Sequence, residues 1–222
     1  MSAEKLLKLI SDEDAEYVDI RFTDPRGKLQ HVTVMSDQVD ADFIEEGFMF
    51  DGSSIAGWKS IEASDMKLMM DTDSGYVDPF YAEKTICVHC YVVEPDTGEA
   101  YNRDPRGTAM KAEAYLKSSG IGDTFFVGPE AEFFLFDDVR FSNSMNKVSF
   151  EVDALDASWN TDTEYEIGNT GHRPGVKGGY FPVNPTDDGQ DIRSEMLSTM
   201  KRLGMSVDKH HHEVASCQHE LG

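Results

Sequence analysis

Residues 125–136 read Phe-Phe-Val-Gly-Pro-Glu-Ala-Glu-Phe-Phe-Leu-Phe, an apolar run that contains two glutamates, Glu130 and Glu132. Aromatic and β-branched side chains in a short run bounded by Gly and Pro indicate a buried strand. Residues two apart on a strand point to the same face, so both carboxylates would project together. Because buried carboxylates repel each other and lose hydration, they need a cationic partner such as arginine, lysine or a divalent metal. The run therefore predicts a strand covered on both sides, with a polar pocket cut into it. The alternative is an amphipathic strand whose glutamates face water.

The composition limits the partners and the compartment of the protein. The chain has 222 residues, with 42 acidic and 20 basic side chains and a net charge of −22. A field of this sign repels nucleic acid and anionic membrane surfaces, whereas it attracts metal cations. No apolar run approaches the roughly 20 residues of a membrane span, and the N-terminus lacks the features of a secretory signal. We therefore expect a cytoplasmic protein that binds neither nucleic acid nor a membrane.

The three cysteines, Cys87, Cys90 and Cys217, support the same compartment. A small, odd number of cysteines without a secretory signal is typical of a reducing cytosol. Cys87 and Cys90 have the spacing of a metal-binding pair, but residues 85–93 indicate a strand, where positions three apart face opposite ways. We interpret all three as structural thiols.

The N-terminal part of the chain, residues 1–103, predicts a small and mostly β domain. Its first ten residues indicate a short amphipathic helix. Alternating apolar and polar side chains then predict strands at residues 16–22 and 29–35, and residues 66–70 and 85–93 are further strand candidates. The turn Asp24-Pro25-Arg26-Gly27 joins the first two strands into a hairpin.

The second domain, residues 104–222, begins with a helix. Asp104 followed by Pro105 is a helix-start signal, and Gly120 ends the apolar period. Beyond the run at 125–136 we expect a polar excursion or flap, then a glycine-led strand, and then a helix, at residues 142–175, 178–183 and 187–203.

A second polar cluster lies near the end of the sequence, where three consecutive histidines precede Glu213. Alternation on a strand sends His211 and Glu213 to one face, and His210 and His212 to the other. Glu213 is the stronger candidate ligand because a hard cation prefers a carboxylate. The alternative for the histidines is an ordinary hydrogen-bonding role near a site. Glu220 follows seven positions later.

Four blocks in order resemble bacterial-type (type I) glutamine synthetase, and the resemblance runs from residue 2 to residue 222. The resemblance implies an α+β fold: a small β-grasp-like N-terminal domain, followed by the first part of the creatine-kinase-like α+β half-barrel catalytic domain. The matching blocks are Phe50-Asp51-Gly52-Ser53-Ser54 with its continuation to Leu68, Gly128-Pro129-Glu130-Ala131-Glu132-Phe133, Asn169 to Val183, and His210-His211-His212-Glu213-Val214-Ala215.

The resemblance implies an ATP-dependent ligase of nitrogen metabolism and glutamine biosynthesis. Such an enzyme joins ammonia to L-glutamate through γ-glutamyl phosphate, with ATP as co-substrate and Mg²⁺ or Mn²⁺ bound. Phosphoryl transfer is largely a matter of positioning and charge neutralisation, which suits an acidic cluster that holds divalent ions. Family members form homo-oligomers, a double hexameric ring of twelve subunits with sites between neighbours.

The family pattern also implies metal ligands in this sequence. By resemblance, Glu132, Glu213 and Glu220 would hold the ion nearest L-glutamate. Glu130 would hold a second ion, the one nearest the transferred phosphate.

The substrate-binding residues follow from the same resemblance. Asp51 would take a proton from bound ammonium, and it reaches the site of a neighbouring subunit in the family. Ser54, Tyr180 and Glu213 would help to line the ammonium site. Asp208 stands where close relatives have a glutamate that contacts ATP.

Besides Asp208, two further departures from the family pattern limit these expectations. Cys217-Gln218 replaces the usual Gly-Gln, one residue is missing before Glu220 relative to the enteric form, and the thiol would be an oxidation liability. The chain is also about half as long as the family's, so we expect an incomplete and inactive fragment. The alternatives are a non-catalytic module that joins full-length synthetase rings, or a related γ-glutamyl-amine ligase.

Overall fold

The computed structural model of the chain describes residues 3–159, 164, 166 and 171–222, and it divides into two compact units. The first unit spans residues 1–126 and the second spans residues 127–222. These units are defined by packing alone, so the domain boundary expected between residues 103 and 104 stays a prediction. None of the helices in the described ranges is long and apolar enough to cross a membrane.

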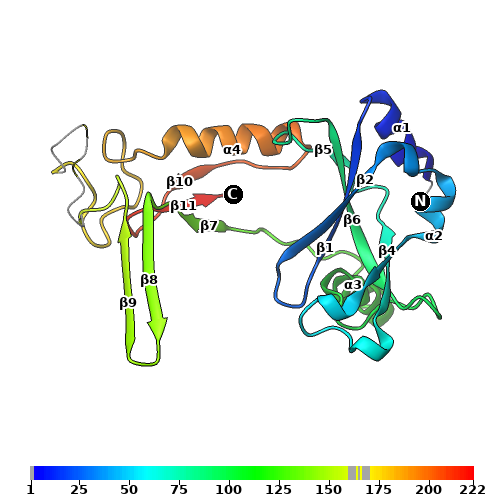
Figure 1. Ribbon diagram of the computed structural model, residues 1–222. Helices are drawn as coiled ribbons and strands as arrows, with labels where there is room; N and C mark the ends of the chain where they lie inside the picture. Colours follow the sequence, from blue (N-terminus) through cyan, green and yellow to red (C-terminus); the bar gives the residue numbers. More distant parts are fainter. Residues whose placement is uncertain (1–2, 160–163, 165, 167–170) are drawn as a thin grey trace. The chain divides into compact units, whose positions relative to one another are not determined.

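The first unit contains a mixed sheet with short helices beside it (Figure 1). Its helices are α1 (Ala3–Asp12), α2 (Ala41–Glu46) and α3 (Pro105–Ser119), with 3-10 turns at Ser36–Gln38, Gly52–Ser54 and Ile61–Ala63. Its strands are β1 (Tyr17–Thr23), β2 (Leu29–Met35), β3 (Phe48–Asp51), β4 (Asp65–Met70), β5 (Tyr76–Val77) and β6 (Thr85–Val93).

The strand order of this sheet is β2-β1-β6-β4-β3, and β5 also pairs with β6. Strands β1 and β6 run parallel, whereas the other pairs are antiparallel. The hairpin predicted from the alternating pattern is confirmed as β1–β2, and the predicted strands at 66–70 and 85–93 are confirmed as β4 and β6. The central strand β6 is almost continuously buried, which explains its run of apolar side chains.

An apolar core fills the first unit. Its fully buried side chains include Ile20, Leu68 and Val88, one from each of the strands β1, β4 and β6. Two aromatic side chains extend this core toward the turn after β3: the Phe50 ring lies 5.8 Å from the ring of Trp58. The core therefore anchors the end of β3, directly before the predicted site residue Asp51.

Helix α3 begins and ends where the sequence predicted. The Asp104 carboxylate accepts hydrogen bonds from the amides of Arg106 and Gly107, which satisfies donors at the helix start. The same buried carboxylate accepts from the amide of Val92 on β6, so the cap also ties the helix to the sheet. Gly120 ends the helix in the left-handed conformation, with φ of 72°.

The second unit contains smaller elements. Its strands and helix are β7 (Ala131–Phe134), β8 (Asp138–Ser144), β9 (Lys147–Asp153), α4 (Gln190–Arg202), β10 (His210–His212) and β11 (Gln218–Leu221). Strands β10, β11 and β7 form an antiparallel sheet in that order, and α4 contacts β10 and β11. Strands β8 and β9 form a long hairpin (Figure 1). The expected α+β class is confirmed.

Three expectations for the second unit were wrong. The run at 125–136 is not a strand covered on both sides: only Ala131–Phe134 is a strand, and Phe126 is 89% exposed. The range 142–175, expected as a flap, contains most of the β8–β9 hairpin, whose polar side chains obscured the strand pattern; residues 160–163, 165 and 167–170 of that range lie outside the described residues. Residues 180–183 form no strand, because φ of Phe181 is 58°, which is incompatible with extended backbone.

Candidate metal centre

Strands β10, β11 and β7 place one side chain each in a row across their sheet. His211 of β10 lies opposite Glu220 of β11, and Glu220 lies opposite Glu132 of β7. Residues directly opposite each other in antiparallel strands point to the same face, so the three side chains project together. Glu213 follows β10 two positions after His211 and joins this face. The row unites segments that are about eighty positions apart in the sequence.

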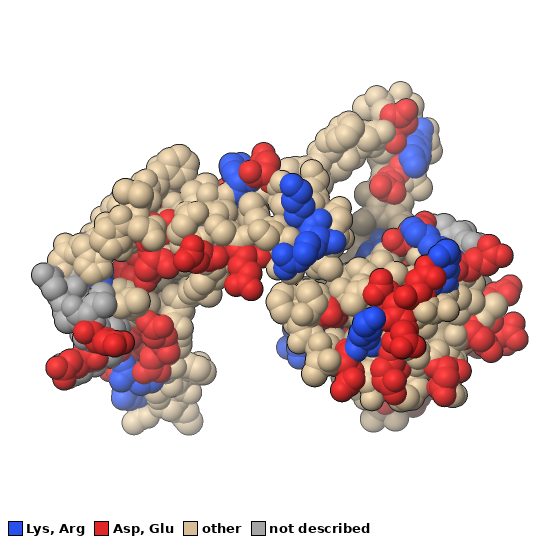
Figure 2. All heavy atoms as spheres, turned by 90° about the horizontal axis from the view of Figure 1, so that it is seen from above, with Lys and Arg blue, Asp and Glu red and all other residues tan. Residues whose placement is uncertain are grey.

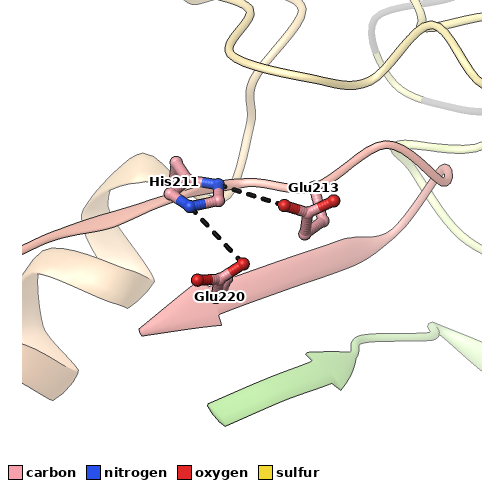
Figure 3. Close-up of side chains that lie close together, drawn as sticks. All are labelled: His211, Glu213 and Glu220. Atoms are coloured by element: carbon pink, nitrogen blue, oxygen red, sulfur yellow. Dashed lines mark ion pairs between the residues drawn. The ribbon is translucent and has the colours of Figure 1, made fainter. Parts of the chain in front are cut away.

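Three side chains of this face form a compact cluster, His211, Glu213 and Glu220 (Figure 3). Each offers a ligand atom, and these atoms lie within 4.8 Å of one another. The Nδ1 atom of His211 lies 3.6 Å from Oε1 of Glu213, and its Nε2 atom lies 3.5 Å from Oε2 of Glu220. These separations exceed ordinary hydrogen-bond lengths, so the three groups surround a space without closing it.

The electrostatics of the cluster favour a bound cation. Burial raises the pKa of Glu220, and the negative charges of Glu130 and Glu213 raise it further, against the opposing effect of His211. A raised pKa means that the ionised carboxylate is destabilised in this environment. A cation between the carboxylates would offset this repulsion and favour their ionised forms.

The donor set fits a divalent metal ion. Carboxylate oxygens suit Mg²⁺ and Mn²⁺, and a neutral imidazole can complete the coordination. Glu213, Glu220 and His211 supply two carboxylates and one imidazole on the least exposed part of this face. The residues present therefore fit the ion that the sequence led us to expect, with His211 as an additional donor.

Glu130 and Glu132, the two glutamates of the apolar run, are exposed and lie outside the compact cluster. Glu132 belongs to the row on the sheet, but its carboxylate is exposed and accepts a hydrogen bond of 3.1 Å from Nε2 of Gln218. Glu130 is also exposed and precedes β7. Neither belongs to the compact cluster found among the described residues. The structure thus brings Glu213 and Glu220 together, and it leaves Glu130 and Glu132 at the margin.

The opposite face of the sheet is supported by a buried arginine. Arg193 of α4 has no exposed surface and pairs with the Asp187 carboxylate. Its guanidinium also donates to Nδ1 of His219 at 2.7 Å and to Nδ1 of His210 at 3.2 Å. Burial and the charge of Arg193 lower the pKa of His219 to about 4, so this histidine is neutral and accepts the hydrogen bond.

His212 forms a second buried contact on that opposite face. Its Nε2 lies 2.8 Å from Oδ2 of Asp156, and its Nδ1 lies 2.6 Å from the Glu213 carbonyl oxygen. Both partners offer acceptor oxygens, so the protonated ring, with a hydrogen on each nitrogen, satisfies both contacts. Burial opposes this charge, but the hydrogen bonds to Asp156 and to the Glu213 carbonyl outweigh it and raise the pKa of His212.

The segment that begins at Gly178 and Gly179 packs against the chain between β10 and β11. The Gly179 amide donates to the Val214 carbonyl at 3.1 Å, and a Cβ on Gly179 would lie 2.5 Å from the Glu213 carbonyl oxygen. Only glycine allows so close an approach. The Tyr180 ring stacks on Phe181 at 3.9 Å, and the Phe181 ring meets the His211 ring edge-on at 4.7 Å.

Asp51 and Ser54 belong to the first unit. The Asp51 carboxylate accepts from the Ser53 amide and hydroxyl at 2.9 and 2.6 Å, and from the Ser54 hydroxyl at 3.1 Å. These hydrogen bonds, those from Ser53 first, hold the pKa of Asp51 below its usual range. Gly52 is required in this turn because a Cβ there would lie 2.4 Å from a side-chain atom of Met66. The result is an exposed, ionised carboxylate on a rigid turn.

Asp208, the residue expected to contact ATP, lines a cavity of about 650 Å³ in the second unit. Glu130, Lys209 and Gly222 also line this cavity. The Asp208 amide donates to the Gly222 carbonyl at 2.9 Å, which fixes the backbone, while the side chain stays exposed.

Sequence reasoning missed Asp156 and Arg193 as supports of the site. Both lie outside the resembling blocks that were quoted, and a lone Asp or Arg is normally exposed. Cys217 was expected to be an oxidation liability, but burial raises the pKa of its thiol to about 12 and removes it from solvent.

Comparisons with known proteins agree with the fold. The family model described as "Glutamine synthetase, beta-Grasp domain" matches residues 14–95, and the one described as "Glutamine synthetase, catalytic domain" matches residues 102–222. Both expected domain types are thereby confirmed. Glutamine synthetase of Cereibacter sphaeroides is 74% identical over 97% of this chain and 46% of its own length. Glutamine synthetase of Rhodobacter capsulatus is 71% identical over 100% of this chain and 51% of its own length.

Solved structures show the same relationship. The chain superimposes on Plasmodium falciparum glutamine synthetase with a TM-score of 0.89 and 25% identity, covering 100% of this chain and 44% of that one. It also matches a structure described as a GmaS/ADP complex, with a TM-score of 0.68 and 18% identity. That match covers 97% of this chain and 43% of the other, and it shows a shared fold. The chain spans about half the length of the curated relatives it matches.

Proposed function

The chain belongs to the glutamine synthetase family, and from this premise we propose that it supplies one half of a site that joins ammonia to L-glutamate at the expense of ATP. The observation that carries the proposal is the cluster of His211, Glu213 and Glu220, arranged in register with Glu132 across the sheet. Such a row suits a divalent ion that faces an anionic substrate.

Within this proposal the acidic residues divide between two ions, Mg²⁺ or Mn²⁺. Glu132, Glu213 and Glu220 hold the ion nearest L-glutamate, and Glu130 contributes to the ion nearest the transferred phosphate. Bound there, the ions would neutralise phosphate charge during phosphoryl transfer. His211 orients the two carboxylates from 3.5 and 3.6 Å and adds a donor to the first site.

Asp51 binds the ammonium ion, together with Ser54, Tyr180 and Glu213. A carboxylate with a lowered pKa is a durable counter-ion for a cation. The lowered pKa also makes the Asp51 carboxylate a weaker proton acceptor. We therefore propose that Asp51 first binds the ammonium ion as a counter-ion and then accepts its proton.

The remaining parts of the proposal concern ATP, assembly and location. Asp208 contacts ATP from the wall of the 650 Å³ cavity. The active protein is a homo-oligomer, a double hexameric ring in which Asp51 serves a neighbouring subunit. The net charge of −22 suits a protein of the cytoplasm that binds neither nucleic acid nor a membrane.

Complementation by the missing half tests the activity. The 222-residue chain is mixed with the separately produced C-terminal half of the Rhodobacter capsulatus relative, and glutamine formation from L-glutamate, ammonium and ATP is measured with Mn²⁺. We expect turnover in the mixture and none from either part alone. Turnover by the 222-residue chain alone would show that the assigned division of the site is wrong, as would a stable complex of both halves without activity.

A metal titration tests the ligands. Glu132→Ala should weaken Mn²⁺ binding more than His210→Ala does, since Glu132 lies in the row and His210 contacts Arg193 on the opposite face. An equal loss of Mn²⁺ affinity in both variants would contradict the assignment of Glu132 as a metal ligand.

A second candidate function is assembly with intact synthetase subunits. The β8–β9 hairpin favours it, because Phe141 and Phe150 lie opposite each other and are 80% and 79% exposed. An exposed apolar strip of this kind is typical of a contact surface. If this is the function, adding the chain to the intact relative should lower its activity, and Phe141→Ser should abolish the effect.

A further inference from the structure

We infer that Asp156 is a positioning residue of the proposed metal centre, whose carboxylate joins both ends of the β10–β11 connection and thereby fixes Glu213 against Glu220. The inference rests on the proposed function, since it concerns the affinity of that site for a divalent ion. Asp156 lies outside the row of candidate ligands and acts through the backbone.

One oxygen of Asp156 makes two contacts that span the connection. Its Oδ2 accepts from Nε2 of His212, the last residue of β10, at 2.8 Å, and also from the amide of Cys217, which precedes β11. His212 in turn donates from Nδ1 to the Glu213 carbonyl at 2.6 Å. An unbroken chain of hydrogen bonds therefore runs from Asp156 to the backbone of the ligand residue.

The backbone of this connection needs such a restraint. Cys217 has a φ of 65°, a left-handed conformation that costs a residue with a side chain about 1–2 kcal/mol. Strained residues persist only where the surroundings hold them. The Asp156 carboxylate is buried and contacts Cys217 directly, so it is one of the groups that hold this conformation.

Removal of the Asp156 carboxylate would leave two buried donors without an acceptor. The His212 ring and the Cys217 amide would then be expected to turn toward other partners, and the connection would move with them. A metal site tolerates deviations of only about 0.2 Å in its ligand distances. Loss of a group that supports a ligand from behind typically lowers metal affinity about 10-fold to 100-fold.

The test measures Mn²⁺ affinity by electron paramagnetic resonance for the parent chain and matched variants. Asp156→Ala should weaken binding at least about 10-fold. Asp156→Asn keeps an oxygen that can accept from both donors but loses the charge that faces the His212 ring, so its loss of affinity should be clearly smaller than that of Asp156→Ala. Asp153→Ala is the control: Asp153 is similarly buried, but its carboxylate pairs with Arg140 on β8. It should lose stability without losing Mn²⁺ affinity.

Each other outcome overturns the inference. Parent-like affinity in Asp156→Ala would show that Glu213 is held without this carboxylate. An equal loss in Asp153→Ala would show that any buried aspartate of this region matters. If circular dichroism shows that Asp156→Ala does not fold, Asp156→Ser is judged by the same 10-fold criterion. A parent chain that binds no Mn²⁺ would overturn the proposed metal centre and the inference with it. If the parent binds Mn²⁺, the variants test the role of Asp156 independently of the metal centre itself.

Discussion

The two units of the molecule are stabilised by different means. In the first unit, buried aliphatic and aromatic side chains from several strands form one core, with Ile20, Leu68 and Val88 fully buried. In the second unit the buried apolar cluster found among the described residues consists of Ala154, Ala157 and Cys217. The largest fully buried side chain of the described chain, Arg193, lies in the second unit and is charged.

The difference shows where the molecule places its chemistry. Apolar burial stabilises by about 25 cal/mol per Å² and needs only matching shapes. Buried charges stabilise little by themselves and must each find a partner. The second unit keeps such pairs directly behind the candidate ligands, Arg193 with Asp187 and His212 with Asp156. The second unit thus places buried charge pairs beside its candidate ligands, whereas the first unit relies mainly on apolar burial.

The largest expected effect is the loss of a buried charge in the second unit. Arg193→Met removes the guanidinium and leaves the Asp187 carboxylate buried without its partner. The free energy of unfolding should fall by about 4 kcal/mol, as is typical of a broken buried pair. Chemical denaturation followed by circular dichroism measures this.

The control for this prediction is Arg202→Met on the same helix, α4. Arg202 is exposed, so its replacement should change the free energy of unfolding by less than about 0.5 kcal/mol. If both variants unfold alike, the buried arginine does not stabilise the second unit.

Truncation of the apolar core should come next in size. Leu68→Ala in β4 removes a fully buried side chain of the first unit, and a loss of about 3 kcal/mol is expected from lost burial and the cavity left behind. Thermal unfolding of the first unit is the measurement. Leu29→Ala, on the exposed face of β2, should be nearly neutral; a comparable loss there would mean that core burial does not separate the two sites.

A buried carboxylate in the first unit should have a smaller effect that depends on pH. Burial raises the pKa of Asp19, but hydrogen bonds from Thr33, His31 and Arg21 outweigh it, so the net pKa is lowered. A lowered pKa means that the ionised form stabilises the fold above the unfolded value of about 3.9, and that this contribution is lost as pH falls through the folded pKa.

Asp19→Asn should therefore cost about 2 kcal/mol at pH 7, and progressively less as pH falls below the unfolded value of about 3.9. Unfolding by denaturant at a series of pH values measures the difference between parent and variant. A difference that stays constant with pH would mean that the carboxylate does not titrate as described.

The smallest expected effect compares one cysteine from each unit. At Cys217, where φ is 65°, glycine should be more stable than alanine by about 1 kcal/mol, because glycine alone relieves the left-handed strain. At Cys90, in the middle of strand β6, alanine should be the more stable by about 1 kcal/mol. All four variants are compared by denaturation under reducing conditions. The same order at both positions would rule out backbone strain at Cys217.

Sequence patterns predicted the first unit well. Strands β1, β2, β4 and β6 were expected from alternation or from apolar runs, and helix α3 was expected from Asp104 at its start and Gly120 at its end. These signals are local, since side-chain periodicity and caps act within a few residues.

The second unit was harder to predict because its elements lack local patterns. The β8–β9 hairpin carries polar side chains on one face and was expected as a flap. The apolar run at 125–136 was expected to be buried, yet Phe134 and Phe136 are 48% and 43% exposed. Apolar content indicates that a segment tends to be covered, but it does not say what covers it.

The candidate site shows the same division. Alternation placed His211 and Glu213 on one face, and the structure adds Glu220 from the neighbouring strand. The supports behind them came from elsewhere in the chain: Asp156 reaches His212 across 56 positions, and Arg193 reaches His219 across 26. No pattern in the sequence joins these residues.

The sequence by itself determined the family, the local elements of the first unit and the identity of the acidic candidates, because these depend on residue type and on short spacing. Only the tertiary structure decided which carboxylates meet. Strand register brings Glu220 opposite both His211 and Glu132, and burial decides that Glu213 and Glu220 cluster while Glu132 stays in solvent. Register and burial arise from packing between distant segments, and a linear sequence does not display that packing.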